Sequence, residues 1–285
     1  MSLEEKQVKA LSENFSAAVA CLAHDVTPKH VHRLRTAIRR IESLVAYARP
    51  HRGHKQEKVL GSLSALRKRA GKVRDLDVQM KLLDAIANTS TRQHRDALNE
   101  LLKRKRSRQA TRLSQAIADV QTAKLDGHVE RLLEKAAEAS DATEKPEAPL
   151  AQARQQLGRL AAETTINAST KARVLHKVRI RIKRMRYLAE LAGKTADQDS
   201  FLTELKAAQD VLGDWHDWEE LTFTAEKQFG DRFNCPLLVE VRALFAAKHV
   251  AACSAAAQLL ASGAATPLRK QARAAESPRA LAQRA

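Results

Sequence analysis

A histidine followed by evenly spaced basic residues occurs twice in this sequence. In both places the order is His-x-x-Arg-x-x-x-Arg or Lys, and the second copy lies 144 residues after the first. Arginine forks and lysine ammonium groups recognise phosphate and carboxylate oxygens, so a row of them indicates an anion-binding surface. The first copy consists of His32, Arg35 and Arg39, and the second consists of His176, Arg179 and Lys183.

Helical spacing places each basic row beside an apolar stripe. At about 100° per residue, the residues of each copy fall on one side of a helix, next to aliphatic side chains that predict a buried face. Within these helices only Glu42 and Glu190 are spaced to neutralise the row, so its cations repel one another unless an anion is nearby. The stripes are Val31, Leu34, Ile38, Ile41 and Val45 in the first copy and Leu175, Val178, Ile182, Met185 and Ala189 in the second.

The two copies belong to a longer internal match. Residues 31–44 align with 175–188, and residues 71–75 align with 213–217 at an offset of 142. An internal duplication is the simplest account of two matches in the same order. Glu42 aligns with Arg186 of the second copy, and we expect Glu42 either to repel a bound anion or to pair with a neighbouring cation such as Arg39.

The histidines and nearby aspartates also allow other chemistry. His32 and His176 suit phosphate contact or orientation of the basic row better than metal ligation, because neither has a second His or Cys at ligand spacing. Four aspartates suit helix caps and counter-ions for arginines better than a metal or acid–base centre. Glycine-rich phosphate loops, nucleophile elbows, His-Glu-x-x-His and Cys-x-x-Cys are absent from the sequence, so we expect neither catalysis nor a cofactor. The aspartates are Asp75, Asp77, Asp214 and Asp217.

The composition favours helices and a polyanionic partner. The 285 residues include 50 Lys and Arg against 33 Asp and Glu, and the resulting net charge of +17 attracts polyanions. With only 9 Gly and 7 Pro, and with Ala, Leu, Arg, Lys, Glu and Gln dominant, the sequence predicts an all-α fold. The three scattered cysteines indicate neither a disulfide framework nor a thiolate metal site.

Apolar periodicity predicts a series of helical segments. Thr27 and Pro28 are typical of the beginning of one helix, Pro50 and Gly53 are expected to end it, and Asp75 is placed to cap a later one. The predicted segments are 3–24, 29–49, 55–71, 75–88, 91–138, 148–165, 170–193, 199–212, 215–229 and 235–261.

Breaks in this periodicity predict two helical bundles. Residues 140–150 contain two prolines and small polar side chains, which is typical of a linker between a first bundle at 1–139 and a second at 151–261. Residues 262–285 form a basic tail that we expect to be mobile. The charged N-terminus and the short apolar run at 17–23 predict a soluble, cytoplasmic protein without membrane association.

A second basic cluster lies in the segment 91–138. It comprises residues 103–108, Lys-Arg-Lys-Arg-Ser-Arg, and Arg112. Charge runs of this kind are typical of a solvated helix face, so we assign this cluster only a supporting electrostatic role.

Together these motifs resemble the conserved-histidine α-helical domain (CHAD) family over about residues 10–260. The resemblance implies two pseudo-symmetric helical bundles whose basic faces meet in a central channel or groove that binds inorganic polyphosphate without catalysis. It also implies a cytoplasmic location in association with polyphosphate granules. The motifs are at residues 31–40, at 73–78, at 175–187 with Glu190, and at 205–213 with Asp217.

Carried over position by position, the resemblance assigns polyphosphate binding to ten side chains. The family commonly has a basic residue where this sequence has Glu42, so we expect the second copy to contribute more than the first. No alternating Glu-x-Glu-x-Lys strand precedes the first copy, so we expect no triphosphate-tunnel (CYTH) domain. The ten residues are His32, Arg35, Arg39, Arg40, Arg74, His176, Arg179, Lys183, Arg184 and Arg186.

Two other functions are alternatives to polyphosphate binding. A nucleic-acid-binding helical protein would use the same positive charge, but 2 Trp, 2 Tyr and 6 Phe offer few stacking platforms, and no helix-turn-helix or zinc-finger signature occurs. We therefore expect only weak, non-specific binding of nucleic acids. A metal-dependent phosphohydrolase would use the four aspartates together with the histidines. The oligomeric state is not predicted by the sequence.

Overall fold

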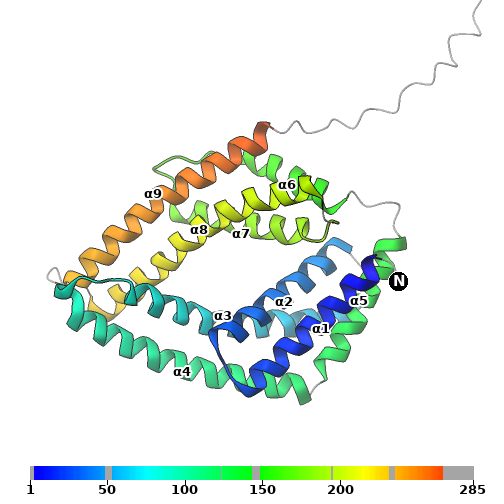
Figure 1. Ribbon diagram of the computed structural model, residues 1–285, viewed down its shortest axis with the longest axis horizontal. Helices are drawn as coiled ribbons and strands as arrows, with labels where there is room; N and C mark the ends of the chain where they lie inside the picture. The colour runs from blue at the N-terminus through cyan, green and yellow to red at the C-terminus, as the bar shows by residue number, and fades with distance from the viewer. Residues whose placement is uncertain are drawn as a thin grey trace, which may run out of the picture.

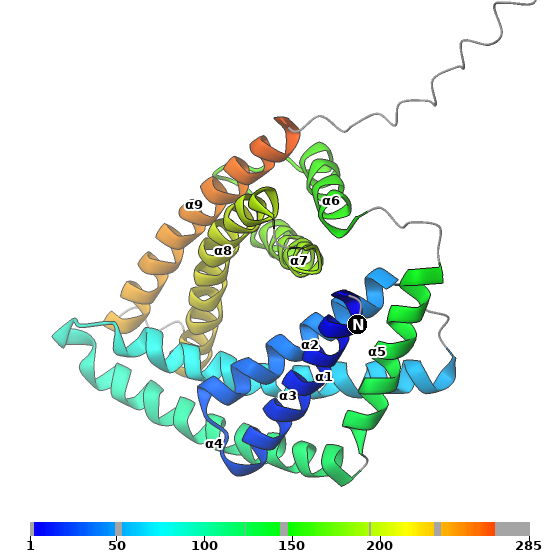
Figure 2. The same ribbon diagram turned by 45° about the vertical axis from the view of Figure 1, so that its right-hand side comes forward.

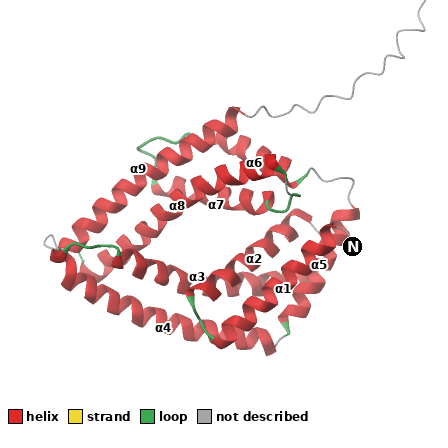
Figure 3. Ribbon diagram, viewed as in Figure 1, coloured by secondary structure: helices red, strands yellow, loops and turns green. Residues whose placement is uncertain are grey.

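The computed structural model describes residues 3–48, 53–122, 124–142, 148–193, 195–230 and 235–265. Within these ranges the chain forms helices joined by loops and turns, without a strand (Figure 3). The prediction of an all-α fold is confirmed. The helices are α1 (Leu3–His24), α2 (Pro28–Ala48), α3 (His54–Asp84), the short 3₁₀ helix η1 (Thr89–Thr91), α4 (Arg92–Thr122), α5 (Leu125–Ala142), α6 (Pro149–Glu163), α7 (Ala172–Ala189), α8 (Ala196–Phe229) and α9 (Pro236–Ala265).

Helix α3 runs straight through a predicted break. The segments 55–71 and 75–88 were expected to be separate helices, but α3 is continuous and ends at Asp84. Gly71, the last residue of the first predicted segment, lies within the helix, where a Cβ atom would be 3.5 Å from the Arg35 Nη1 atom. Asp75 therefore lies inside a helix, and the prediction that it caps one is wrong.

Two further boundaries differ from the sequence prediction. The segments 199–212 and 215–229 also form one continuous helix, α8. Conversely, the segment 91–138 is divided between α4 and α5 at Lys124, whose φ angle of 49° is incompatible with a right-handed helix. Local apolar periodicity identified helical residues, but packing between distant helices decided which neighbouring segments are continuous.

The predicted beginning of α2 is confirmed. Pro28 is its first residue, and the Thr27 Oγ1 atom accepts a hydrogen bond of 3.2 Å from the backbone N–H of His30. A hydroxyl acceptor followed by proline satisfies the unpaired N–H groups of a first helical turn. Of the two residues expected to end this helix, Pro50 lies outside the described residues, and Gly53 immediately precedes α3.

A buried glutamine fixes the end of α7 against the beginning of α8. The Gln198 Nε2 atom donates hydrogen bonds to the carbonyl oxygens of Ala189, at 2.8 Å, and Ala192, at 3.0 Å. The Thr195 Oγ1 atom in turn accepts from the backbone N–H of Gln198 at 3.1 Å. These bonds satisfy free carbonyl groups at the end of α7 and hold that helix at a fixed angle to α8.

The predicted linker and tail lie partly outside the described residues. Helix α5 continues to Ala142 and α6 begins at Pro149, so residues 143–147 of the predicted linker 140–150 are outside. Helix α9 continues to Ala265, and the remainder of the predicted tail 262–285 is also outside. The boundaries of the two bundles and the internal duplication stay predictions.

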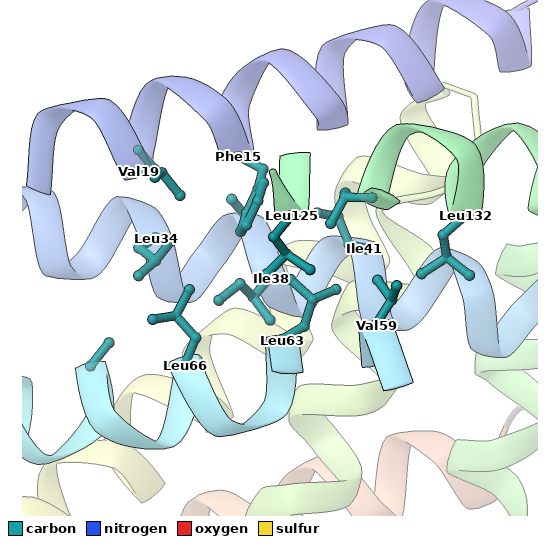
Figure 4. Packing of buried hydrophobic residues seen from close by; sticks show 14 of the residues in the cluster. Phe15, Val19, Leu34, Ile38, Ile41, Val59, Leu63, Leu66, Leu125 and Leu132 are labelled. Atoms are coloured by element: carbon teal, nitrogen blue, oxygen red, sulfur yellow. The ribbon is translucent and has the colours of Figure 1, made fainter. Parts of the chain in front are cut away.

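Three clusters of buried hydrophobic side chains hold the helices together. The first lies among α1 to α5, and Figure 4 shows part of it, including Phe15, Ile38 and Leu63. The second lies among α6 to α9 and includes Trp215. The third joins the C-terminal part of α3 and the N-terminal part of α4 to α8 and α9, through residues such as Leu83 and Trp218. Figure 1 shows the α8–α9 pair meeting α3 and α4 at one corner of the molecule.

The two apolar stripes predicted from the basic helices are buried. All five stripe residues of α2 and all five of α7 belong to the hydrophobic clusters, and Ile38 and Ile182 are completely inaccessible to solvent. Helices α2 and α7 contact each other near the centre of the molecule (Figure 2). Burial of the stripes fixes the rotation of both helices, and the basic rows that border the stripes must therefore face the space between them.

Helix α9 is also long and apolar enough to span a membrane by length and composition, from Pro236 to Gly263. Here it packs against α6 and α8. A core helix of a soluble protein meets the same two criteria, so this single helix does not decide between the two kinds of protein.

Close packing of α9 on α6 gives a stability prediction. A Cβ atom at Gly263 would lie 2.6 Å from the Leu157 Cγ atom, so we expect Gly263→Ala to lower the free energy of unfolding by about 1–3 kcal/mol despite the better helix propensity of alanine. The matched control is Gly61→Ala in α3, an exposed site with no atom within 4 Å of the new Cβ, which should raise that free energy by about 0.5–1 kcal/mol. Urea denaturation measures both changes, and equal effects at the two sites would contradict the packing described here.

Candidate anion-binding site

A groove of about 790 Å³ lies between α2 and α7, with α3 and α6 at its edges. Both basic rows contribute to it. Of the ten residues assigned from the sequence, five line the groove, one from α2 and four from α7. They are Arg39, His176, Arg179, Lys183 and Arg184.

The cations of α2 and α7 form one cluster with Arg74 of α3. Burial lowers the pKa of the Arg35 guanidinium, and Arg39 and Arg74 lower it further. Burial likewise lowers the pKa of Arg179, and the same two arginines contribute. Because Arg39 of the first row lowers the pKa of Arg179 of the second row, the two rows lie within electrostatic reach of each other. The structure therefore brings together two basic rows that are 144 residues apart in the chain.

Lys183 lies within electrostatic reach of four arginines of this cluster. Burial, followed by Arg179 and Arg39, lowers its pKa to about 6. Neither a hydrogen bond nor an ion pair joins the Lys183 ammonium to another described residue. An amine with this pKa is mostly neutral at pH 7 while the groove holds no anion. A bound anion would favour the charged form and draw a proton onto Lys183.

Two aspartates partly neutralise the positive charge of this cluster by pairing with Arg74 and Arg35. Arg74 donates two hydrogen bonds to the Asp217 carboxylate, at 3.0 and 3.3 Å, and so joins α3 to α8. The Arg35 Nη1 atom lies 3.4 Å from Asp75 Oδ1 and 3.3 Å from the carbonyl oxygen of Gly71. These contacts hold Arg35 and Arg74 in place without occupying the groove itself. Neither of these two arginines lines the groove. We assign them a supporting role, in which their positive charges add to the electrostatic potential of the groove.

One glutamate, Glu190, forms ion pairs with two of the predicted binding residues. The Glu190 carboxylate lies 3.1 Å from Arg40 Nε and 3.5 Å from Arg186 Nε. Arg186 also places its guanidinium 4.9 Å from the centre of the Tyr187 ring. Arg40 and Arg186 do not line the groove. The structure thus places them beside the end of the site, as a contact between α2 and α7.

Glu42 pairs with a cation that the sequence analysis did not single out. Its carboxylate lies 2.9 Å from Arg67 Nε of α3, and both side chains line the groove. The expectation that Glu42 pairs with Arg39 is wrong, because α3 packs alongside α2 and brings Arg67 to this position. The Arg39 Nη1 atom is instead 3.5 Å from the Tyr187 hydroxyl oxygen across the groove.

A third histidine, His216, belongs to the site. Its ring centre lies 5.1 Å from that of His176, and its Nδ1 atom lies 3.1 Å from the Glu219 carboxylate. Burial and then Arg179 lower the pKa of His216 to about 3, so this ring stays neutral. The alignment of 71–75 with 213–217 places His216 opposite Arg74, and that correspondence was the signal in the sequence for its position.

The two predicted histidines differ in exposure. His176 is half-buried and lines the groove, whereas His32 is exposed at the other end of the cluster. Burial lowers the pKa of both, with Arg74 adding to the effect at His32 and Arg179 at His176. In the part of the chain that the structure describes, no group of three or more His, Cys, Asp or Glu side chains is placed to hold a metal ion.

The four aspartates considered for a metal centre are dispersed. Besides the two that pair with Arg35 and Arg74, Asp77 lies 2.9 Å from Arg106 and Asp214 lies 2.8 Å from Lys248. All four are inside α3 or α8, so the cap interpretation is wrong. The interpretation as counter-ions for arginines is confirmed for Asp75, Asp77 and Asp217, whereas Asp214 pairs with a lysine.

The second basic cluster on α4 lies apart from this groove. Arg106 donates to Asp77 and to the carbonyl oxygen of Val26, and Lys103 pairs with Glu100 at 2.9 Å. Both cations line a separate pocket of about 530 Å³ at the end of α1. These cations have structural partners, unlike Lys183.

The described chain is an α-helical domain in which two basic helices line one groove. The family model described as the CHAD domain matches residues 5–226, and the chain belongs to this family. The crystal structure of the CHAD domain from the plant Ricinus communis is similar, with a TM-score of 0.68 at 18% identity over 91% of this chain and 89% of that one. PptA from Streptomyces chartreusis is also similar, with a TM-score of 0.58 at 16% identity over 90% of this chain and 95% of that one. No curated protein matches the sequence.

The environment of Lys183 predicts that this residue costs stability. We expect Lys183→Met to raise the free energy of unfolding by about 0.5–2 kcal/mol, because it removes an amine that burial and four neighbouring arginines disfavour as a cation. The pKa of Lys183 is about 6 in the folded chain against an ordinary 10.5, so unfolding takes up a proton between these values and wild-type stability rises with pH there. The gain from Met is therefore largest near pH 6 and shrinks toward pH 10.

Urea denaturation at pH 6 and pH 9 measures this effect. The matched control is Lys177→Met, an exposed lysine on the same helix, for which we expect a change near zero at both pH values. A Lys183→Met variant that is less stable than wild type at pH 6 would show that the ammonium is well accommodated, contrary to the description above.

Proposed function

We propose that this protein binds inorganic polyphosphate in the groove between α2 and α7, without hydrolysing it. The observation that carries the proposal is the convergence of Arg39 from one helix with Arg179 and Lys183 from the other. A repeating anion satisfies such a paired row, because each phosphate unit offers oxygens to guanidinium groups on both sides. Membership of the CHAD family supports the same ligand.

The electrostatics of the empty groove support a polyanion rather than a single phosphate. Burial and mutual repulsion lower the pKa values of Arg35, Arg179 and Lys183 together. An anion that extends along the groove relieves this repulsion at several positions at once, whereas one phosphate relieves it locally. Binding then releases counterions from the polyanion and weakens as salt rises. We also propose that this groove is part of a central basic channel, formed by two helical bundles that arose by internal duplication.

Nucleic acid fits the groove less well than polyphosphate. The two aromatic residues that line it are Tyr47 and Tyr187, and the Tyr187 ring is buried beneath the Arg186 guanidinium. Single-stranded nucleic acids depend on exposed rings for base stacking. A volume of about 790 Å³ also matches a small-ligand cleft rather than the broad surface that a duplex needs. We propose at most weak, non-specific nucleic-acid binding at other basic surfaces.

A metal-dependent phosphohydrolase is the less favoured alternative. Such a centre needs several carboxylates or histidines around one point. Asp75 and Asp217 instead pair with arginines, sharing Arg74, and Asp77 and Asp214 pair with Arg106 and Lys248. Among the described residues, no group of three or more His, Cys, Asp or Glu side chains is placed to hold a metal ion. We therefore propose a binding role in the cytoplasm, with association of the protein to polyphosphate granules through this groove.

Chain length provides the first test. We expect long-chain polyphosphate to bind more tightly, per binding site, than orthophosphate, tripolyphosphate or ATP, because only a long anion engages the cations of α2 and α7 along the whole groove. Isothermal titration calorimetry at constant ionic strength measures the four affinities. Equal affinities for short and long phosphates would contradict binding along an extended groove.

Charge removal provides the second test. The double variant Arg39→Gln with Arg179→Gln should weaken polyphosphate binding at least about tenfold, because each arginine makes charged hydrogen bonds worth about 1.5–3 kcal/mol. The matched control, Arg33→Gln with Lys177→Gln, removes the same charge from exposed positions on the same two helices. Circular dichroism checks that both variants stay helical. If the control weakens binding as much as the groove variant, the net charge of the protein is responsible rather than the groove.

The Glu42–Arg67 pair provides the third test. We expect Glu42→Gln to strengthen polyphosphate binding and to steepen its dependence on the logarithm of salt concentration, since Arg67 becomes available to the anion. The measurement is the affinity at three or more salt concentrations. A loss of affinity would mean that Glu42 holds Arg67 in a productive position, and that this pair does not compete with the ligand.

A further inference from the structure

Lys183 differs from the other lysines of the described chain in its surroundings. The side chain is half-buried and lines the groove together with Arg39 of α2 and Arg179 of its own helix. Arg35 of α2 and Arg74 of α3 do not line the groove but lie within electrostatic reach of Lys183. Glu42 and Arg67, which also line the groove, pair with each other, and Asp217 of α8 pairs with Arg74. The neutral His216 lies behind His176. Among the described residues, no carboxylate forms an ion pair with the Lys183 ammonium group.

A neutral lysine amine is a nucleophile, whereas an ammonium group is not. Burial and the four arginines hold the pKa of Lys183 at about 6. At neutral pH, Lys183 is therefore uncharged in most copies of the protein, and its Nζ atom carries a free electron pair. Arg39 and Arg179, which line the groove with it, would at the same time bind the phosphate group of a small anionic reagent. That phosphate favours the ammonium form, so the reaction proceeds from the fraction of Lys183 that stays neutral while the reagent is bound. The groove thus combines an amine in its reactive form with a phosphate-binding surface.

We propose that Lys183 is a site of acylation by acyl phosphates. The amine Nζ attacks the carbonyl carbon of the mixed anhydride, a C–N bond forms, and the C–O bond to phosphate breaks. The products are an amide at Lys183 and inorganic phosphate, and the proton lost from Nζ passes to phosphate or water. No oxidant, metal or further reactant is required.

Acylation at this position would change the electrostatics of the groove. The amide can no longer take up a proton when an anion binds, so one cation is lost permanently from the ligand-bound state. The modification would therefore lower affinity for polyanions, and a polyanion already in the groove would shield Lys183 from the reagent. This inference depends on the proposed anion binding for delivery of the reagent, but not for the reactivity of the amine.

Other lysines provide internal controls. Lys177 is exposed on the same helix. Lys103 pairs with Glu100, which raises the pKa of this exposed lysine and keeps it charged. At pH 7.5 an ordinary amine is neutral in only about one molecule in a thousand. A weakly basic amine attacks more slowly once neutral, so we expect a net advantage of about tenfold for Lys183 over Lys177.

The test is acetylation of the full chain by acetyl phosphate, followed by peptide mass spectrometry over time. Lys183 should be acetylated about tenfold faster than Lys177 at pH 7.5, and added polyphosphate should slow the reaction at Lys183 but not at Lys177. The rate at Lys183 should level off at a lower pH than the rate at Lys103, whose pKa is raised by its hydrogen bond to Glu100. A Lys183 rate equal to or below that of Lys177 overturns the proposal.

A second reagent separates this proposal from the proposed function. The second reagent is N-hydroxysuccinimidyl acetate, an uncharged ester without a phosphate or sulfonate group. Its rate therefore reports the reactivity of the amine alone. If Lys183 reacts no faster than Lys177 with either reagent while polyphosphate binds at full affinity, the acylation proposal fails and the binding function stands. If Lys183 reacts faster with both reagents while polyphosphate does not bind, the acylation proposal stands and the binding function fails.

Discussion

The central constraint on this protein is that two rows of like charge lie next to each other in a half-buried groove. Arg39, Arg179 and Lys183 approach from two helices, and burial together with repulsion from neighbouring arginines lowers the pKa values of Arg179 and Lys183. Such an arrangement costs free energy in the absence of an anion. It persists because the apolar stripes of α2 and α7 are buried in large hydrophobic clusters, whose stabilisation exceeds the repulsion.

The contacts around the groove limit this repulsion without removing it. Asp217 and Asp75 pair with Arg74 and Arg35 behind the groove, and Glu190 pairs with Arg40 and Arg186 at its end. Lys183 has no such partner among the described residues. Within the described part of the chain, Arg39, Arg179 and Lys183 face the groove without an ion pair, whereas Arg67 at its edge pairs with Glu42. This distribution is what an anion-binding site requires, because a ligand gains most from the charges that the protein itself has not paired.

The sequence predicted the parts of this site that depend on local periodicity. The apolar stripes and the basic rows of α2 and α7 follow from residue spacing within single helices, and the structure places them as that spacing indicates. Spacing within a single helix does not predict ion pairs between residues that are distant in the sequence. Arg74 and Asp217 are 143 residues apart, and Arg67 reaches Glu42 only because α3 packs beside α2.

Continuity of the long helices was also beyond the reach of local patterns. Gly71 has the low helix propensity of a breaking residue, yet α3 continues through it, with the Arg35 side chain packed against that turn. His216 went unassigned because its role depends on contact with His176 and Glu219 and on burial within α8. In each case a tertiary contact decided the outcome over a local preference.

A crystal structure of the protein with bound tripolyphosphate tests the central claim most directly. The account predicts electron density for the anion between α2 and α7, with phosphate oxygens in hydrogen-bonding contact with Arg39, Arg179 and Lys183. It also predicts little movement of Arg35 and Arg74, which their aspartates already hold. Phosphates bound to the basic cluster at residues 103–108 and Arg112, with the α2–α7 groove empty, would contradict it.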